Sequence, residues 1–131
     1  MIVRIRKGDY ILMARGLGFT PGAYGLIAGF VEPGESIEET IHREVMEEVG
    51  IRITNIQYVG SQPWPFPDSL MMGFTADYLS GEIVVDYTEL ETAGWYRYNE
   101  LPGLPSSRLS LSSQLIQSFV ADLEKEHAHD Q

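Results

Sequence analysis

The sequence predicts an α/β fold in which two helices pack against a mixed β-sheet. Short runs rich in β-branched and aromatic residues recur along the chain, two segments carry apolar residues at helical spacing, and turns containing Gly or Pro separate them. The chain has 131 residues, of which 44% are hydrophobic and 21% are charged. That size and balance are typical of one globular domain, so we expect a single α/β sandwich over residues 1–131.

The first part of the chain is expected to form strands and a loop. Residues 2–5 alternate apolar and charged side chains, and a Lys-Gly-Asp turn at 7–9 separates them from a second apolar run at 10–14. This arrangement predicts a β-hairpin. Residues 15–25 contain four glycines, which indicates a loop, and they lack the Lys-Ser/Thr pair of a phosphate-binding P-loop. The apolar run at 26–31 predicts a short buried strand.

A helix over residues 37–49 has clear signals at both ends. Ser36 can cap its first turn, and Glu39 follows three positions later, which is the spacing of a capping box. Gly50 stands where a left-handed C-terminal cap needs a glycine. A buried stripe is predicted from the apolar residues that recur every fourth position, which are Ile37, Ile41, Val45 and Val49.

The second half of the chain is expected to add four strands, at residues 51–60, 70–79, 82–85 and 93–98. Between the first two, residues 61–69 contain three prolines, which exclude a helix or a central strand there.

A second helix is expected near the C-terminus, with Ser112 or Ser113 as its cap. The polar tail from Glu124 is expected to fray, which would leave His127 and His129 unstructured. The helix is predicted from the spacing of Leu115, Ile116, Phe119, Val120 and Leu123.

Composition excludes several classes of protein. The chain has no Cys, so disulfides, Cys-based zinc sites, iron–sulfur centres and a thiol nucleophile are excluded. No apolar run reaches the ~18–20 residues that a membrane-spanning helix needs, and the first residues are too basic and too short for a signal peptide. We therefore expect a cytoplasmic protein without a membrane partner. The net charge of −10 argues against a broad basic surface for nucleic acid.

Three acidic residues share one face of the first predicted helix. Glu44, Glu47 and Glu48 stand at positions i, i+3 and i+4, where their carboxylates repel one another. A divalent cation such as Mg²⁺ would offset that repulsion, since it binds carboxylate oxygens and leaves other positions for water and phosphate. The alternative is a solvated acidic helix face.

The acidic face is part of a longer motif, which at residues 29–51 reads Gly29-x5-Glu35-x7-Arg43-Glu44-Val45-x-Glu47-Glu48-x-Gly50-Ile51. This motif is similar to the Nudix box, and through it the chain resembles a Nudix hydrolase. That resemblance implies an α/β/α sandwich with a loop–helix–loop site for Mg²⁺ or Mn²⁺, and hydrolysis of a nucleoside diphosphate linked to a further group. It implies metal binding by Glu44, Glu48 and the Ala28 carbonyl, and Glu47 as a metal ligand or general base. Glu35 and Arg43 would lock the loop to the helix.

Residues 61–69 read Ser-Gln-Pro-Trp-Pro-Phe-Pro-Asp-Ser. Alternate prolines stiffen the backbone, so the two aromatics between them suit a planar ring; aromatics that fill the core are the alternative. The segment is similar to the signature of the NADH diphosphatase subfamily. That resemblance implies cleavage of NADH or NAD⁺ to nicotinamide mononucleotide and AMP, removal of an NAD cap from RNA, a homodimer, and Glu89 as a further metal ligand. The implied substrate contacts are Ile2, Phe30, Gln62, Pro63, Trp64, Pro65, Phe66, Pro67, Asp68, Ser69 and Ser112.

The chain departs from the longer members of that subfamily in two ways. It has neither their N-terminal domain nor their four-Cys zinc ribbon, so no zinc is expected, and it has Ser112 where they commonly have Ala. Two other functions stay open at this point. One is a Nudix hydrolase for ADP-ribose, another nucleoside diphosphate derivative or an oxidised nucleoside triphosphate. The other is a catalytically silent nucleotide-binding module.

Overall fold

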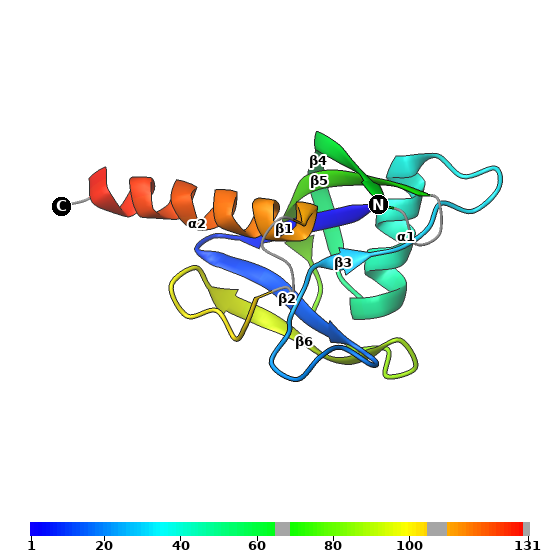
Figure 1. Ribbon diagram of the computed structural model, residues 1–131, viewed down its shortest axis with the longest axis horizontal. Coiled ribbons are helices and arrows are strands. Elements are labelled where there is room, and N and C mark those ends of the chain that lie inside the picture. Colours follow the sequence, from blue (N-terminus) through cyan, green and yellow to red (C-terminus); the bar gives the residue numbers. More distant parts are fainter. Residues whose placement is uncertain (65–68, 105–109, 130–131) are drawn as a thin grey trace.

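A mixed β-sheet lies between two helices in the computed structural model of the protein (Figure 1). The structure describes residues 1–64, 69–104 and 110–129. Helix α1 (Ile37–Val49) packs on one face of the sheet, and helix α2 (Leu111–His129) packs on the other. The α/β sandwich expected from the sequence is therefore confirmed.

The strand order of the sheet is β4-β5-β1-β2-β6. The N-terminal hairpin is confirmed, and Gly8 adopts the positive φ of 59° that its turn requires. Strands β1 and β5 run parallel, whereas the other neighbours are antiparallel. The bounds of these strands are β1 Ile2–Lys7, β2 Tyr10–Gly16, β4 Arg52–Trp64, β5 Ser69–Ser80 and β6 Leu90–Arg97.

On the side opposite β5, strand β1 pairs with two different strands along its length. Its C-terminal half pairs with β2, through Arg6 and Ile11, while its N-terminal half pairs with the two-residue strand β3 (Ile27–Ala28). The strand expected over 26–31 was therefore too long. After Ala28 the chain leaves the sheet toward α1. The Gly29 N–H still donates to the Met1 carbonyl, next to the start of β1, and residues 30–35 then form a loop.

Helix α1 begins and ends as predicted. The backbone N–H of Glu39 donates to the Ser36 side chain, and the Glu39 carboxylate accepts from the Ser36 backbone N–H, so the capping box is complete. Gly50 has φ 71° and donates to the Met46 and Val45 carbonyls. The apolar stripe of α1 contacts a core that includes Val3 of β1.

The alternation of β1 sends its side chains to two cores. Val3 and Ile5 lie in the core under α1, while Ile2 lies in the core under α2 with Phe119, which is fully buried. Both cores are apolar, so both helices are held mainly by hydrophobic burial.

Residues 82–85 do not form the predicted strand. They belong to a loop that lies along the C-terminal end of α1, where the Val84 N–H donates to the Val49 carbonyl and the Asp86 N–H to the Glu48 carbonyl. These carbonyls are among the last four of the helix and have no partner within it. The loop satisfies them, which is why the segment is extended without joining the sheet.

Helix α2 differs from the prediction at both ends. Its cap is Ser110, whose Oγ accepts from the Ser113 N–H at 3.1 Å, and not Ser112 or Ser113 themselves. The expected fraying from Glu124 was also wrong, because the helix continues to His129. Contacts with distant residues stabilise this part: the Arg6 Nη2 donates to Glu126 at 2.8 Å, and His127 bonds to Asp9 at 2.9 Å and stacks on Tyr98.

Among the described residues of the proline-containing segment, 61–64 form neither a helix nor a central strand, as predicted, and Ser69 is the first residue of β5. Pro63 lies on β4, which is the edge strand of the sheet, where a missing backbone N–H is tolerated. Residues 65–68 lie outside the described residues. In the described part of the chain, neither helix has the length and apolar character needed to cross a membrane.

The cap of α1 gives a test of the fold. Replacing Ser36 by Ala should lower the free energy of unfolding by about 1 kcal/mol, since the Glu39 N–H loses its acceptor. Urea denaturation followed by circular dichroism measures the change. Ser118→Ala is the matched control, because Ser118 is exposed within α2, and it should leave the free energy of unfolding unchanged or slightly raised. Equal effects of the two substitutions would contradict the assigned cap.

Candidate functional site

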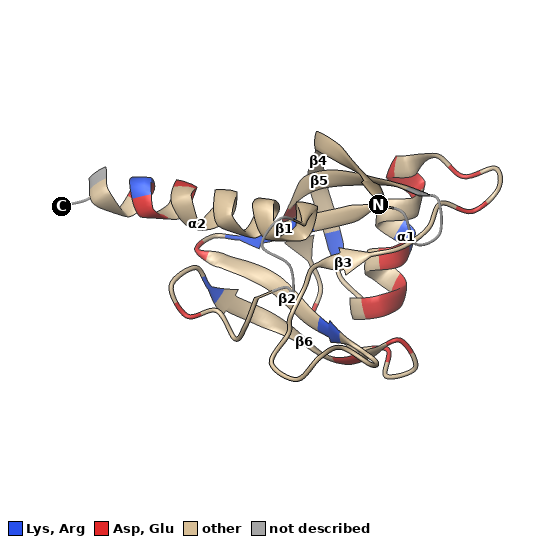
Figure 2. Ribbon diagram, in the orientation of Figure 1, with Lys and Arg blue, Asp and Glu red and all other residues tan. Residues whose placement is uncertain are grey.

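The acidic face of α1 is the centre of the candidate site. Glu44, Glu47 and Glu48 project from this face, and Figure 2 shows further acidic residues in the two loops beside the helix. Their exposures differ: Glu48 is buried, the Glu44 side chain is 16% exposed and the Glu47 side chain is 58% exposed. The helix thus carries one carboxylate into the protein and leaves another facing solvent.

Burial and neighbouring charges make Glu48 hard to ionise. Burial raises the pKa of Glu48 to about 7, and the charges of Glu44, Glu89 and Asp86, and then that of Glu47, act in the same direction. Burial also raises the pKa of Glu44, although its bond to Arg43 opposes the shift. The site therefore concentrates more negative charge than its own cations neutralise. Such a set of carboxylate oxygens fits a divalent cation.

Arg43 connects this helix to the loop that precedes it. Its Nε donates to the Glu35 Oε2 at 2.7 Å and its Nη2 to the Glu35 Oε1 at 3.0 Å, which forms a bidentate pair. The hydrogen bonds from Arg43 and then Thr40 lower the pKa of Glu35 to about 2. The Nη2 of Arg43 also donates to the Phe30 carbonyl at 3.1 Å. Residues 30–35 are thereby fixed against α1.

The remaining nitrogen of Arg43 engages two of the three helix carboxylates. Its Nη1 donates to Glu44 at 2.9 Å and to Glu47 at 3.2 Å. With these contacts, no three acidic or His side chains among the described residues converge as metal ligands. The carboxylates of this face are chemically suited to bind a cation, and two of them, Glu44 and Glu47, form ion pairs with Arg43 in this structure.

Gly29 is required by the side chain of Glu44. A Cβ at Gly29 would overlap the carboxyl group of Glu44, so any other residue would displace the carboxylate. The close approach explains why the motif has a glycine here, next to Ala28. Sequence analysis assigned no packing role to this glycine.

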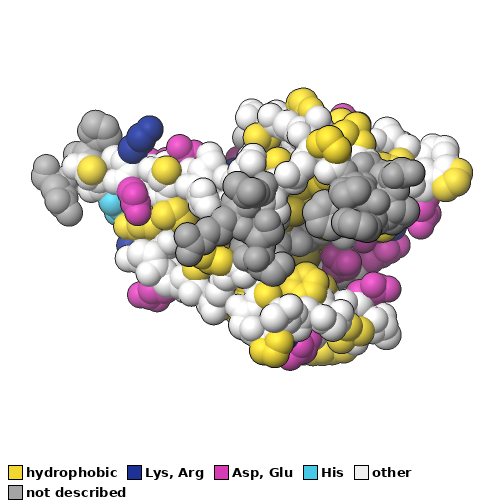
Figure 3. All heavy atoms as spheres, viewed as in Figure 1, with side chains coloured by type: hydrophobic (Ala, Val, Ile, Leu, Met, Phe, Trp, Pro, Cys, Tyr) yellow, Lys and Arg dark blue, Asp and Glu magenta, His cyan; other side chains and the backbone are white. Residues whose placement is uncertain are grey.

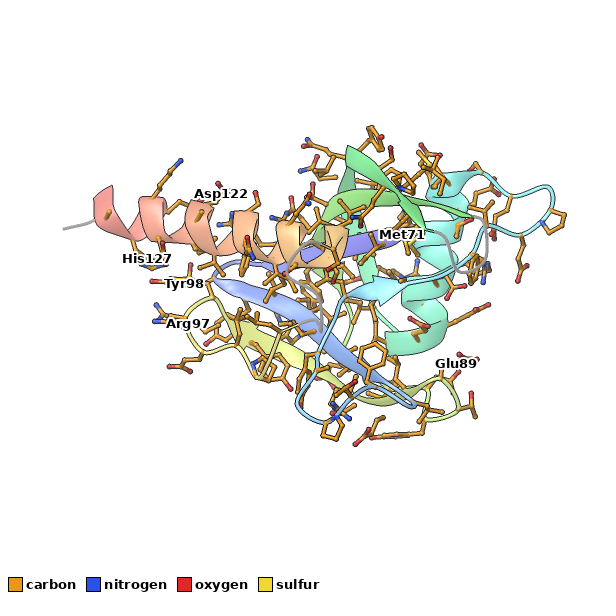
Figure 4. The ribbon with its side chains drawn as sticks, viewed as in Figure 1. Met71, Glu89, Arg97, Tyr98, Asp122 and His127 are labelled. Atoms are coloured by element: carbon orange, nitrogen blue, oxygen red, sulfur yellow. The ribbon has the colours of Figure 1, made fainter. Side chains whose placement is uncertain are left out.

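A loop from the other side of α1 brings two more carboxylates to the site. Glu89 lies beside the C-terminal end of α1 in Figure 4, and its charge raises the pKa values of both Glu44 and Glu48. The Asp86 Oδ1 accepts from the Thr88 N–H at 3.0 Å and from its Oγ1 at 2.7 Å, which holds the turn that precedes Glu89. Sequence analysis missed Asp86, although an Asp two residues before a Thr is a turn signal.

A cavity of about 370 Å³ has Ala28 in its wall, and the residue after Ala28, Gly29, approaches Glu44 of the acidic face. Three residues expected to contact substrate line it, Ile2, Gln62 and Ser112, together with Ala28, which was expected to bind metal through its carbonyl. The Gln62 Oε1 accepts from the Leu111 N–H at 2.9 Å, which ties β4 to the first residue of α2. In Figure 3, hydrophobic and acidic side chains lie side by side in the depression on this face of the molecule. An apolar cavity with few polar groups suits a planar heterocycle.

A second cavity of about 370 Å³ shares Ala28 with the first. Phe30, whose residue surface is 74% exposed, lines it together with Met71 and Met72 of β5. Ala28 therefore lines both cavities, and the next residue, Gly29, packs against Glu44 of the acidic face.

Among the described residues, the expected substrate contact Pro63 lines neither of these cavities. Pro63 is exposed on β4, and the backbones of Trp64 and Ser69 pair across β4 and β5. Pro65, Phe66, Pro67 and Asp68 lie outside the described residues.

A sequence comparison shows that the NUDIX domain model matches residues 1–118. Curated relatives include the NAD-capped RNA hydrolases NudC of Pseudomonas syringae pv. syringae, at 53% identity over 122 residues, and of Pseudomonas entomophila, at 54% over 121 residues. The alignments cover 93% and 92% of this chain but 44% of each relative. The chain thus spans less than half the length of these relatives.

Solved structures of Nudix proteins share the fold. A NUDIX hydrolase from Nitrosomonas europaea has a TM-score of 0.68 at 23% identity, with 92% of this chain and 86% of that chain covered. A Caenorhabditis elegans Ap4A hydrolase has a TM-score of 0.67 at 16% identity, with 95% and 96% covered. Nudix hydrolases generally use divalent metal ions. On the domain match and these relatives, the chain belongs to the Nudix hydrolase family.

Proposed function

We propose that this chain is a metal-dependent pyrophosphohydrolase that cleaves NADH or NAD⁺ to nicotinamide mononucleotide and AMP. The observation that carries the proposal is the position of Ala28, which lines both apolar cavities and is followed in the chain by Gly29, packed against Glu44 of the acidic face. A dinucleotide needs that combination, since its diphosphate and its ring must bind side by side. Relatives at 51–54% identity that bear the name NAD-capped RNA hydrolase support the choice of substrate.

The metal of the proposed reaction is Mg²⁺ or Mn²⁺. We assign Glu44, Glu47, Glu48, Glu89 and the Ala28 carbonyl as the groups that would hold it. When bound, such an ion neutralises phosphate charge and lowers the pKa of a coordinated water. The raised pKa of Glu48 supports this assignment, because a cation would favour the charged form that the protein alone disfavours.

The chain's own groups position the reactants. Arg43 holds residues 30–35 against α1 through Glu35, so the backbone next to Ala28 does not move when the diphosphate enters. The Glu47 side chain is the most exposed of the three helix carboxylates, and we assign it to accept a proton from the attacking water. The water oxygen bonds to one phosphorus, the bridging P–O bond breaks, and both mononucleotides leave as phosphate monoesters.

The cavities hold the rings of the dinucleotide in this proposal. Ile2 contributes apolar surface, and Gln62 and Ser112 contribute polar groups, to the first cavity, while Phe30 lines the second. The roles of Pro63, Trp64, Ser69 and the residues at 65–68 stay predictions from the resemblance, as do the homodimer and the cytoplasmic location. NAD-capped RNA is a proposed second substrate, on the names of the relatives.

Substitution of Glu48 tests the proposed reaction. Incubation with NADH and Mg²⁺ should yield nicotinamide mononucleotide and AMP, separated by chromatography, and Glu48→Gln should slow this reaction by about 100-fold or more because a buried carboxylate of the cluster is lost. Glu38→Gln is the matched control, since Glu38 is exposed in the first turn of the same helix, and its rate should equal that of the wild type.

Two results would contradict the proposed substrate or the proposed activity. Faster turnover of ADP-ribose than of NADH would favour the other Nudix substrates. Absence of any metal-dependent product, with nucleotide still bound, would favour a silent binding module.

The pKa of Glu48 gives a test that requires neither substrate nor metal. Its value of about 7 exceeds the ordinary 4.5, so between these values the folded protein binds more protons than the unfolded chain. In EDTA the free energy of unfolding should therefore fall as the pH rises from 4.5 to 7, and Glu48→Gln should flatten this slope. Glu47→Gln should retain most of it, because Glu47 is the weakest of the charges acting on Glu48. Urea denaturation at several pH values measures the slopes, and an unchanged slope in Glu48→Gln would count against this environment.

A further inference from the structure

The loop between β2 and β3, residues 17–26, forms one wall of the first cavity. It contains no regular secondary structure beyond a single bridge between Gly25 and Ala14, and Gly18 and Gly22 adopt positive φ angles. Such a segment loses much conformational entropy when it becomes ordered, so contacts must hold it in place. The loop residues on the cavity include Gly18, Phe19, Thr20, Ala23, Tyr24 and Gly25.

Arg15, near the end of β2, supplies three of these contacts. Its Nη1 donates to the Thr20 carbonyl at 3.0 Å and to the Ala23 carbonyl at 2.9 Å, and its Nη2 donates to the Phe19 carbonyl at 3.3 Å. The Arg15 side chain is only 13% exposed. One guanidinium thus binds three carbonyls of one loop, which a lysine ammonium cannot do with the same geometry.

Two further groups hold the guanidinium itself. Glu91 of β6 accepts from the Nη2 at 3.3 Å, and the Cζ of Arg15 lies 5.7 Å from the centre of the Tyr24 ring. Tyr24 belongs to the loop and lines the cavity, so Arg15 contacts the loop through both its backbone and an aromatic face.

The Phe19 ring packs against the two ends of the loop, at Gly16 and Gly25. A Cβ at Gly16 would lie 2.6 Å from the Phe19 ring, and a Cβ at Gly25 would lie 3.5 Å from it, so the ring covers both ends of the loop. Because Arg15 also binds the Phe19 carbonyl, its loss would release the residue that joins the loop ends.

We propose that Arg15 is a positioning residue that sets the affinity of the first cavity for the ring of a nucleotide. Arg15 is not among the described residues that line the cavity, so it acts through the loop and not by touching the ligand. The inference rests on the proposed function for the nature of the ligand. Its chemical class is a planar heterocycle carried by a mononucleotide or dinucleotide.

Steady-state kinetics with NADH and Mg²⁺ test this role through the two kinetic constants separately. Arg15→Gln should raise KM about tenfold with kcat within about twofold, because the wall of the cavity is lost while the acidic face is intact. The KM of Arg15→Lys should lie between that of Arg15→Gln and that of the wild type. Arg6→Gln is the matched control. Arg6 also bonds to a backbone carbonyl, that of Gly8, and to a glutamate, but it lies at the C-terminal end of β1, away from the cavity at Ile2. The KM and kcat of Arg6→Gln should equal those of the wild type.

Hydrogen exchange and binding separate this inference from the proposed function. The loop amides should exchange faster in Arg15→Gln than in the wild type, and saturating AMP or nicotinamide mononucleotide should restore their protection. Titration calorimetry of the same two mononucleotides into metal-free protein should show a dissociation constant about tenfold weaker in Arg15→Gln. This result would support the role of Arg15 even if NADH were not hydrolysed.

Three outcomes would overturn the inference. One is faster loop exchange with unchanged KM and unchanged mononucleotide affinity. Another is a fall in kcat at constant KM. The third is a wild-type protein that binds neither NADH nor the mononucleotides. If Arg15→Gln does not fold, Arg15→Lys decides by the same measurements.

Discussion

The buried carboxylate of Glu48 is the constraint around which the rest of the site is arranged. Helix α1 carries it inward beside Glu44, and both loops that flank the helix bring further charges to it: Arg43 pairs the loop at 30–35 with the helix, and the loop at 82–89 adds Asp86 and Glu89. Two neighbouring carboxylates that are both withdrawn from solvent lower the stability of the folded protein unless a cation binds between them. The fold confines this electrostatic destabilisation to one cluster of carboxylates, and such clustering is typical of a functional site.

The same constraint explains how a protein of net charge −10 can act on a polyanion. Seven of the 19 acidic residues lie between positions 32 and 48, against one base, Arg43. The negative charge is thus concentrated where divalent ions would lie between carboxylates and phosphates. The cavity that Ala28 lines is, by contrast, largely apolar and depends on packing and on the loop that Arg15 holds. Charge selects the diphosphate in this account, and shape selects the ring.

Elements with local signals were predictable from the sequence, and elements defined by distant contacts were not. The bounds of α1 followed from Ser36, Glu39 and Gly50, which act within one turn of the helix. Residues 82–85 have strand-like composition, but the Val84 N–H donates to a carbonyl of α1 and not to a neighbouring strand. The C-terminal part of α2 looked like a tail because its stabilising partners, Arg6 and Asp9, are more than 100 residues away. The acidic face was predictable from helical spacing, whereas the described residues that line the first cavity come from five separate segments of the chain.

The central claim is that the acidic face and the adjoining cavities together cleave the diphosphate bond of a dinucleotide with the help of a metal ion. The most direct measurement is the identity and ratio of the products formed from NAD⁺ as Mg²⁺ or Mn²⁺ is titrated into the protein. The account predicts no product without metal, and equal amounts of nicotinamide mononucleotide and AMP once metal is present. Release of free nicotinamide with ADP-ribose, or equal product formation in EDTA, would contradict it.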